Sequence, residues 1–248
     1  MRIHSLIALS IAMLLGCSQQ KQLQEETAET NPNGSKKKVN FFYLDGVKKD
    51  IVRTAYYFPD GALRSDIHFK GGKPDSIEII NYQNGKRYKE AWHNLGKKTG
   101  KSMLWYENGQ VKSEAVFAND TPQGSAVTYF ENGNKQSEIT YKNGKRVGAL
   151  TAWFSNGNKK KITTYANDVR NGPEQEWYEN GKLKLEQNYK NDMLEGMSIS
   201  YYENGKKEEE ATYKNNVLDG KKTRWNEKGK LVGEATFQNG EMLEGKSY

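Results

Sequence analysis

The chain has little of what a thick globular core or a disulfide framework requires. It contains one cysteine and five prolines in 248 residues, its hydrophobic content is 35%, and its mean hydropathy is −0.96. One cysteine cannot form an intramolecular disulfide, and so polar a chain has few side chains to bury. The composition therefore excludes a disulfide-stapled scaffold and argues against a thick globular core.

Motifs for common catalytic and cofactor sites are also missing from the sequence. It contains no Gly-Lys-Ser/Thr phosphate loop and no dinucleotide-binding fingerprint. His4 lies in the N-terminal leader, and His68 and His93 have no cysteine partner, which argues against zinc binding and His-dependent hydrolysis. We expect no cofactor, no metal and no enzymatic activity.

The N-terminal residues follow the order of a secretory signal. Arg2 precedes an apolar stretch, Ile3 to Leu15, that is too short to span a bilayer, so residues 1–16 are predicted to be a signal peptide. Leu14-Leu15-Gly16-Cys17 resembles the lipobox of bacterial lipoproteins, which implies cleavage before Cys17 and its acylation with lipids such as palmitate. The alternative is an ordinary signal peptide in which the cysteine is incidental. Ser18 follows, and the resemblance to Gram-negative sorting then implies the outer membrane of the bacterial cell envelope.

The segment after the cysteine is polar. Residues 17–40 are predicted to be an acylated cysteine with a flexible linker, because Gln, Glu, Thr and Lys dominate and almost nothing can be buried. Without Arg2 the chain has 37 basic and 31 acidic residues, a net charge of +6. The charges are interspersed, which favours solubility over a dedicated polyanion site.

Residues 41–248 repeat with a period of 24. A turn glycine recurs eight times without drift, usually after two aromatics, an acidic residue and asparagine. Asn-Gly occupies the centre of a type I′ turn, so Glu107-Asn108-Gly109-Gln110 is predicted to be such a hairpin turn. A second turn in each repeat, for example residues 141–148, is longer and is predicted to form a wider loop. The recurring glycines are Gly61, Gly85, Gly109, Gly133, Gly157, Gly181, Gly205 and Gly229.

The segments between turns alternate with a period of two. Val111, Ser113, Ala115 and Phe117 alternate with more polar residues, as in a half-buried strand. The fold class is therefore all-β: an elongated single-layer antiparallel meander of about eight 24-residue β-hairpin repeats, advancing roughly 10 Å per repeat.

These repeats resemble the MORN-repeat variant family, whose bacterial members include YwqK-type antitoxins. The resemblance rests on copies of Tyr-Tyr-Glu-Asn-Gly-Lys followed by Glu, Tyr-Lys-Asn and a glycine, and it covers nearly all of residues 41–248. It implies an extended β-hairpin array, and either scaffolding, phospholipid binding or neutralisation of a toxin. Several copies depart from the pattern: Asn81, His93 and Asn226 replace aromatics, and Ser76 replaces a glycine.

Two columns of side chains are candidate sites. An acidic column should make cross-strand pairs with lysines such as Lys112 or Lys184, because neighbours about 10 Å apart cannot share a calcium ion. An aromatic row could bind sugars, bases or peptide side chains, although packing within the sheet is the favoured interpretation. The acidic column is Asp66, Glu90, Glu114, Glu138, Glu186, Glu210 and Glu234, and the aromatic row is Trp105, Tyr129, Trp153, Trp177, Tyr201 and Trp225.

Repetition without a catalytic constellation favours a membrane-anchored binding or scaffold lipoprotein with an unidentified protein partner. Two alternatives stay open: an antitoxin or immunity-like protein, which the family resemblance alone implies, and a binder of envelope polysaccharide or anionic lipid. Export argues against nucleic acid as a partner.

Overall fold

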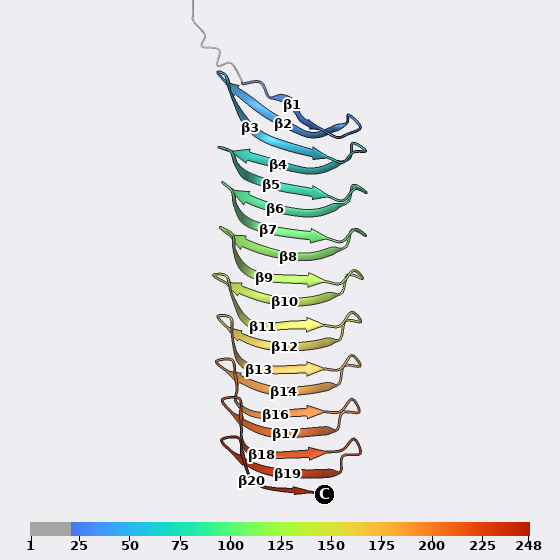
Figure 1. Cartoon of the computed structure of the whole chain (residues 1–248), viewed down its shortest axis with the longest axis vertical. Helices are drawn as coiled ribbons and strands as arrows, with labels where there is room; N and C mark the ends of the chain where they lie inside the picture. The colour runs from blue at the N-terminus through green and yellow to red at the C-terminus, as the bar shows by residue number, and fades with distance from the viewer. Residues whose placement is uncertain (1–20) are drawn as a thin grey trace, which may run out of the picture.

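The computed structural model describes residues 21–248, and its regular structure there is entirely antiparallel β-sheet. Twenty strands form one open sheet in which each strand pairs with the strands before and after it in the sequence (Figure 1). Two short strands, β15 and β16, share one rung beside β14, so the sheet has nineteen rungs. At about 4.8 Å per rung the sheet is about 85 Å long. The predicted all-β meander is confirmed.

The strands of the N-terminal half are β1 (Gln24–Thr30), β2 (Lys36–Asp45), β3 (Lys48–Tyr57), β4 (Leu63–Lys70), β5 (Lys73–Asn81), β6 (Arg87–Asn94), β7 (Lys97–Trp105), β8 (Val111–Ala118), β9 (Thr121–Tyr129) and β10 (Lys135–Lys142). Those of the C-terminal half are β11 (Lys145–Trp153), β12 (Lys159–Ala166), β13 (Val169–Trp177), β14 (Leu183–Lys190), β15 (Met193–Leu194), β16 (Gly196–Tyr201), β17 (Lys207–Lys214), β18 (Val217–Trp225), β19 (Leu231–Gln238) and β20 (Glu241–Ser247).

The sheet begins earlier in the sequence than expected. The prediction of a flexible linker up to residue 40 is wrong from residue 24 onward, because β1 and the first half of β2 lie there. Composition was misleading since β1 is an exposed edge strand, where polar residues suffice. Its glutamates pair with lysines of β2 and β3, and Val39 in β2 is 1% exposed. The predicted signal peptide and Cys17 lie outside the described residues.

The Asn-Gly turns are three-residue loops, not type I′ turns. The Gly109 N–H donates to the carbonyl of Tyr106 at 2.9 Å, and the Tyr106 N–H donates to the carbonyl of Gln110 at 2.8 Å. Gly109 has φ of 96°, whereas Asn108 is not in the positive-φ region. This is a turn followed by one left-handed residue and a bulge, the usual three-residue hairpin loop.

The second turns are the type I′ turns, so the two predicted turn types are exchanged. Asn143 and Gly144 have φ of 51° and 79°, and Lys142 pairs directly with Lys145. Asn119 and Asp120, with φ of 49° and 68°, form the same turn one repeat earlier. The pair Asn-Gly fits both turns, so the dipeptide alone did not separate them.

Gly148, at the end of the predicted wide loop, and its equivalents in other repeats lie inside strands, at bulges. Gly172 in β13 has φ of 123°, and a Cβ there would lie 3.2 Å from the side chain of Thr164. Gly220 in β18 is equivalent, with a Cβ position 3.0 Å from Thr212. Glycine is required because the bulge combines a positive φ with close approach of the neighbouring strand.

The core is thin, as the composition predicts. The buried apolar side chains are few and mostly small, including Ala55, Ala91 and Ala211, with Ile139 among the larger ones. Stability must therefore come from contacts between neighbouring rungs along the whole array. No helix in residues 21–248 is long and apolar enough to cross a membrane.

Candidate binding surfaces

An asparagine ladder runs along the edge formed by the Asn-Gly turns. Asn108 Oδ1 accepts the N–H of Gln110 at 2.8 Å, and Asn108 Nδ2 donates to the carbonyl of Glu131 in the next turn at 3.0 Å. Asn132 repeats both contacts, at 3.0 Å to the N–H of Asn134 and 2.8 Å to the carbonyl of Ser155. Asparagine is therefore needed here for its side-chain amide, which closes one turn and joins it to the next.

Tyrosines add a second link between consecutive repeats at this edge. The Tyr106 hydroxyl donates to the carbonyl of Tyr129 at 2.8 Å. Tyr82, Tyr178 and Tyr202 make the same bond at 2.7–2.8 Å to the residue 23 positions later. Phe130 and Phe154 occupy the same position without a hydroxyl. The sequence pattern of paired aromatics showed the position but not this bond.

The type I′ turns form the other edge, where each turn bonds to the preceding hairpin. The Asp168 N–H donates to the carbonyl of Arg146 at 3.1 Å, and its carboxylate accepts from the Arg146 N–H and Nε at 3.0 and 2.8 Å. The Arg146 guanidinium lies 4.2 Å from the ring centroid of Tyr165, which links it to the next strand. Arg170 repeats the arrangement with Asp192 and the Tyr189 ring. These charges are thus engaged within the sheet.

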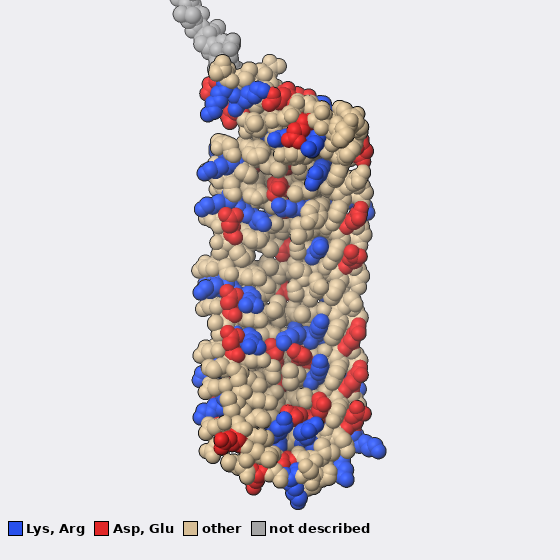
Figure 2. Space-filling view, viewed as in Figure 1, with Lys and Arg blue, Asp and Glu red and all other residues tan. Residues whose placement is uncertain are grey.

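Charge is distributed differently along the two edges. Figure 2 shows acidic side chains in a column over the Asn-Gly turns on its right-hand side, and mixed but mainly basic side chains over the type I′ turns. The exposed glutamates of the Asn-Gly turns are Glu107, Glu131, Glu179, Glu203 and Glu227.

The predicted acidic column lies on one face of the sheet, which we call the acidic-ladder face. Each member is engaged by a neighbour: Glu114 accepts from Lys101 at 2.9 Å and from the Tyr129 hydroxyl at 2.6 Å, and Glu138 pairs with Lys135 at 2.8 Å. The remaining pairs are Asp66 with Arg53, Glu90 with Arg87, Glu186 with Tyr201, Glu210 with Lys207, and Glu234 with Lys221. The expected pairing within the sheet is therefore present.

The prediction that Lys112 and Lys184 pair with the acidic column is wrong. Lys112 lies 5.2 Å from the Tyr106 ring centroid and Lys184 lies 5.8 Å from that of Tyr178, because the bulge after each Asn-Gly turn directs this position toward the aromatic. The hydrogen bond to Glu114 raises the pKa of Tyr129 to about 12, and burial contributes. The same bond is the main cause that lowers the pKa of Glu114 below its usual value, followed by Lys101.

The predicted aromatic row also lies on the acidic-ladder face, with one member at the C-terminal end of each of the strands β7, β9, β11, β13, β16 and β18. Its six residues are half-buried. Lys135 bridges Glu138 and the Trp153 ring, with its Nζ 5.8 Å from the centroid. Lys159 and Lys207 cover Trp177 and Trp225 at 5.9 Å each. Packing against lysine stems occupies part of the ring surface that a ligand would need.

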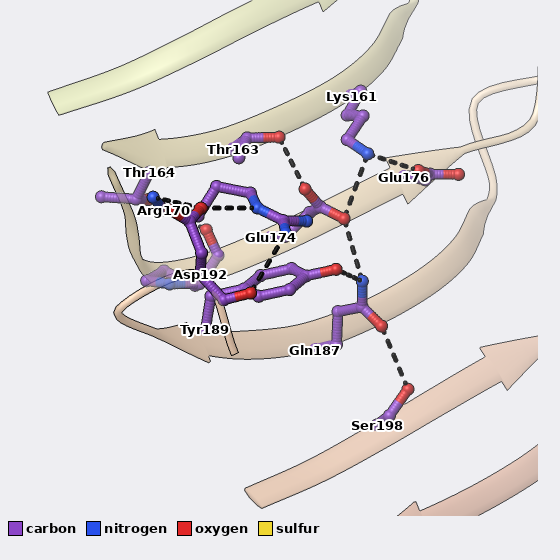
Figure 3. Close-up of polar contacts among 11 residues, drawn as sticks. Lys161, Thr163, Thr164, Arg170, Glu174, Glu176, Gln187, Tyr189, Asp192 and Ser198 are labelled. Atoms are coloured by element: carbon purple, nitrogen blue, oxygen red, sulfur yellow. Dashed lines mark hydrogen bonds and ion pairs between the residues drawn. The ribbon is translucent and has the colours of Figure 1, made fainter. Parts of the chain in front are cut away.

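The opposite face carries a compact polar network that the sequence did not reveal (Figure 3). Glu174 is 3% exposed and accepts from the Thr163 hydroxyl at 2.8 Å, Gln187 Nε2 at 2.9 Å and Lys161 Nζ at 3.1 Å. Lys161 also pairs with Glu176 at 2.8 Å. Burial opposes the charge on Lys161, yet these bonds raise its pKa, so the ammonium stays protonated.

Two similar ion-pair groups occur elsewhere on this face. Glu78 pairs with Lys89 at 2.8 Å, and Glu209 pairs with Lys222 at 3.0 Å. The intervening rungs carry small or aliphatic residues such as Ser137, Leu150 and Ala152 at equivalent positions. Along this face of the sheet, rungs with ion-pair groups are thus separated by rungs with small or aliphatic side chains. Among residues 21–248, no group of three or more His, Cys, Asp or Glu side chains could hold a metal ion.

Five segments of the chain match the family described as MORN repeat variant: residues 98–119, 122–143, 170–191, 194–215 and 218–239. No curated protein matches the chain. Solved structures that resemble it include "Crystal Structure of TcdB2-TccC3-TEV", with 13% identity, 86% of this chain and 14% of that chain covered, and a TM-score of 0.22. "Crystal Structure of TcdB2-TccC3" has 10% identity, 85% and 16% coverage, and a TM-score of 0.20. This chain spans only about a seventh of the length of those chains.

Proposed function

We propose that this chain, a repeat protein with MORN repeats, is a membrane-anchored binding or scaffold lipoprotein that presents its sheet to a protein partner. The observation that carries the proposal is a single-layer sheet about 85 Å long with both faces open. Such a surface can make repeated contacts over a long distance. The acidic column and the Glu174 network are paired within the sheet, which favours binding over catalysis.

Acylation of Cys17 would hold the sheet close to a bilayer of the cell envelope. The first strand starts at Gln24, seven residues after Cys17, and an extended chain covers at most about 3.5 Å per residue. One end of the sheet would therefore lie within about 25 Å of the anchored residue. The proposed arrangement is a rigid arm on a short tether, with outer-membrane sorting as the expected location.

A protein partner is favoured over polysaccharide by the state of the aromatic row. Sugar stacking needs open ring faces, whereas lysines cover three of the tryptophans. Protein interfaces instead use mixed apolar and polar surface, which this sheet offers on both sides.

The test is photo-cross-linking of the full chain in intact cells, with a photoreactive residue placed in turn on each face and each edge. The proposal expects a defined protein adduct from at least one surface. A Cys17→Ser variant should lose membrane association while the purified chain keeps its β-rich circular dichroism spectrum. If no surface yields a protein adduct under several growth conditions, the proposed binding role is contradicted.

A further inference from the structure

One position on the acidic-ladder face breaks the repeat pattern in two consecutive copies. Trp92 and Val116 occupy it and are 43% and 41% exposed. Trp92 pairs with Ile77 of β5, and Gly100 of β7 lies beside it, with a Cβ position 3.7 Å from the Trp92 Cβ. The other six copies are polar: His68, Thr140, Thr164, Asn188, Thr212 and Thr236. The repeat fold thus accepts threonine here, and packing within the sheet does not require an exposed tryptophan.

The type I′ turn next to Trp92 carries a second exception. Leu95 has φ of 49° and is 50% exposed. Its N–H donates to Asp75 Oδ1 at 3.0 Å, so the turn is held in place despite the side chain. Six later turns place asparagine at this position: Asn119, Asn143, Asn167, Asn191, Asn215 and Asn239. Left-handed backbone costs a leucine more than an asparagine, and such strain persists where a side chain serves a function.

Basic side chains border this apolar surface. Lys70, Lys73 and Lys97 are exposed, lie on the same face near the turn, and have no carboxylate within 4.0 Å in the described part of the chain. The nearby acids are already engaged: Glu90 by Arg87, and Glu114 by Lys101. The surface therefore combines exposed apolar side chains with unpaired positive charge.

We propose that Ile77, Trp92, Leu95 and Val116, bordered by Lys70, Lys73 and Lys97, form a docking surface, the Trp92 patch, for an acidic amphipathic segment of a partner protein. Its apolar side chains would cover Trp92 and Leu95, and its carboxylates would meet the lysines. Tryptophan is the residue type most enriched at the energetic centre of interfaces, and complementary charge favours one orientation and partner class. This inference rests on the proposed protein-binding function and assigns it to one surface.

The test uses a displayed library of 16-residue peptides selected on the full chain alone, and the selected peptides are then measured against a Trp92→Thr/Val116→Thr variant. Both substitutions install the residue that equivalent copies already carry, so folding should be unaffected. We expect enriched peptides to combine acidic and apolar residues, and the variant to bind a synthesised winner at least tenfold more weakly. Raising the salt concentration should weaken binding further, since unpaired lysines contribute.

Two variants separate docking from folding. Met197→Ser removes another exposed apolar side chain on the same face, 53% exposed, and should leave peptide affinity unchanged. Leu95→Asn should raise the unfolding temperature and lower the affinity for the peptide. If Leu95 served only to stabilise the fold, its replacement would instead lower the unfolding temperature.

Three results would overturn the proposal. The first is enrichment of basic peptides, and the second is equal binding of the selected peptide by the Trp92→Thr/Val116→Thr variant. The third is that the chain binds vesicles containing anionic phospholipid and no peptide. If whole-cell cross-linking yields the same protein adducts in wild type and in this variant, the Trp92 patch is not the docking surface, but the proposed protein-binding function stands. Absence of all adducts would contradict the broader binding function.

Discussion

Replacing Tyr106 by phenylalanine removes one hydrogen bond between consecutive repeats and leaves the ring in place. The hydroxyl donates to the Tyr129 carbonyl at 2.8 Å in a half-buried position. A hydrogen bond of this kind contributes about 1 kcal/mol net, and the abandoned carbonyl can still reach water at the edge of the sheet. For a domain of this size that loss corresponds to a decrease of about 2–4 °C in unfolding temperature.

The chain supplies its own reciprocal experiment. Phe130 and Phe154 occupy the same position in the two following repeats. Adding a hydroxyl with Phe130→Tyr should create the missing bond to the Trp153 carbonyl and raise the unfolding temperature by a similar amount. Urea unfolding of both variants, followed by circular dichroism, measures the two free-energy changes. If Tyr106→Phe is neutral while Phe130→Tyr is destabilising, the hydroxyls do not join the repeats and this explanation of stability is wrong.

Three further perturbations test other parts of the structure. Asn108→Gly should cost about 1 kcal/mol because it removes the side-chain bonds of the ladder. Asn167→Gly, in a type I′ turn, should be nearly neutral because glycine suits φ of 53°; equal effects of the two changes in urea unfolding would contradict the assignment of the two turn types. Glu174→Leu alone should cost about 1–3 kcal/mol, because the buried Thr163 hydroxyl loses its acceptor and Lys161 loses one of its two carboxylates. The fourfold change Lys161→Ser/Thr163→Ile/Glu174→Leu/Glu176→Ala installs the residues of the preceding repeat and should restore stability to within about 1 kcal/mol; a fourfold variant no better than the single one would show that the network is not interchangeable with apolar packing. The fold raises the pKa of Tyr129 from about 10 to about 12, so the contribution of its hydroxyl to the free energy of unfolding is complete below pH 10 and is lost as the pH rises toward 12. The stability advantage of wild type over Tyr129→Phe should therefore shrink between pH 10 and pH 12. An advantage that grows with pH would contradict this linkage.

The sequence allowed the architecture to be predicted because a single local pattern repeats eight times. Once Gly109 and its equivalents fix the turns at 24-residue spacing, consecutive hairpins can pair only with their neighbours in the chain. What the pattern could not distinguish was which turn uses Asn for a positive φ and which uses its amide, since Asn143 and Asn108 look alike in sequence. The first strand and the first half of the second were missed because β1 is almost wholly exposed and its glutamates pair with lysines of β2 and β3, so the polar composition there resembles that of a linker.

The sites were less predictable than the fold for a related reason. The pairing of the acidic column follows from its spacing, but which lysine reaches Glu114 depends on a bulge that shifts Lys112 toward Tyr106. The Glu174 network joins residues from three strands, and each residue alone looks like ordinary surface polarity in the sequence. Leu95 illustrates the converse: its departure from asparagine is visible in the sequence, but its strained φ and exposure needed the structure.

Small-angle X-ray scattering of the purified chain, produced without residues 1–16 and with Cys17 replaced by serine, tests most directly whether residues 24–247 form one open sheet. A sheet of nineteen rungs predicts a largest dimension near 90 Å and a radius of gyration of roughly 26 Å or more. A compact globule of the same length would have a radius of gyration of about 17 Å. A value near 17 Å would contradict the extended sheet, and with it the proposal that binding takes place on its open faces.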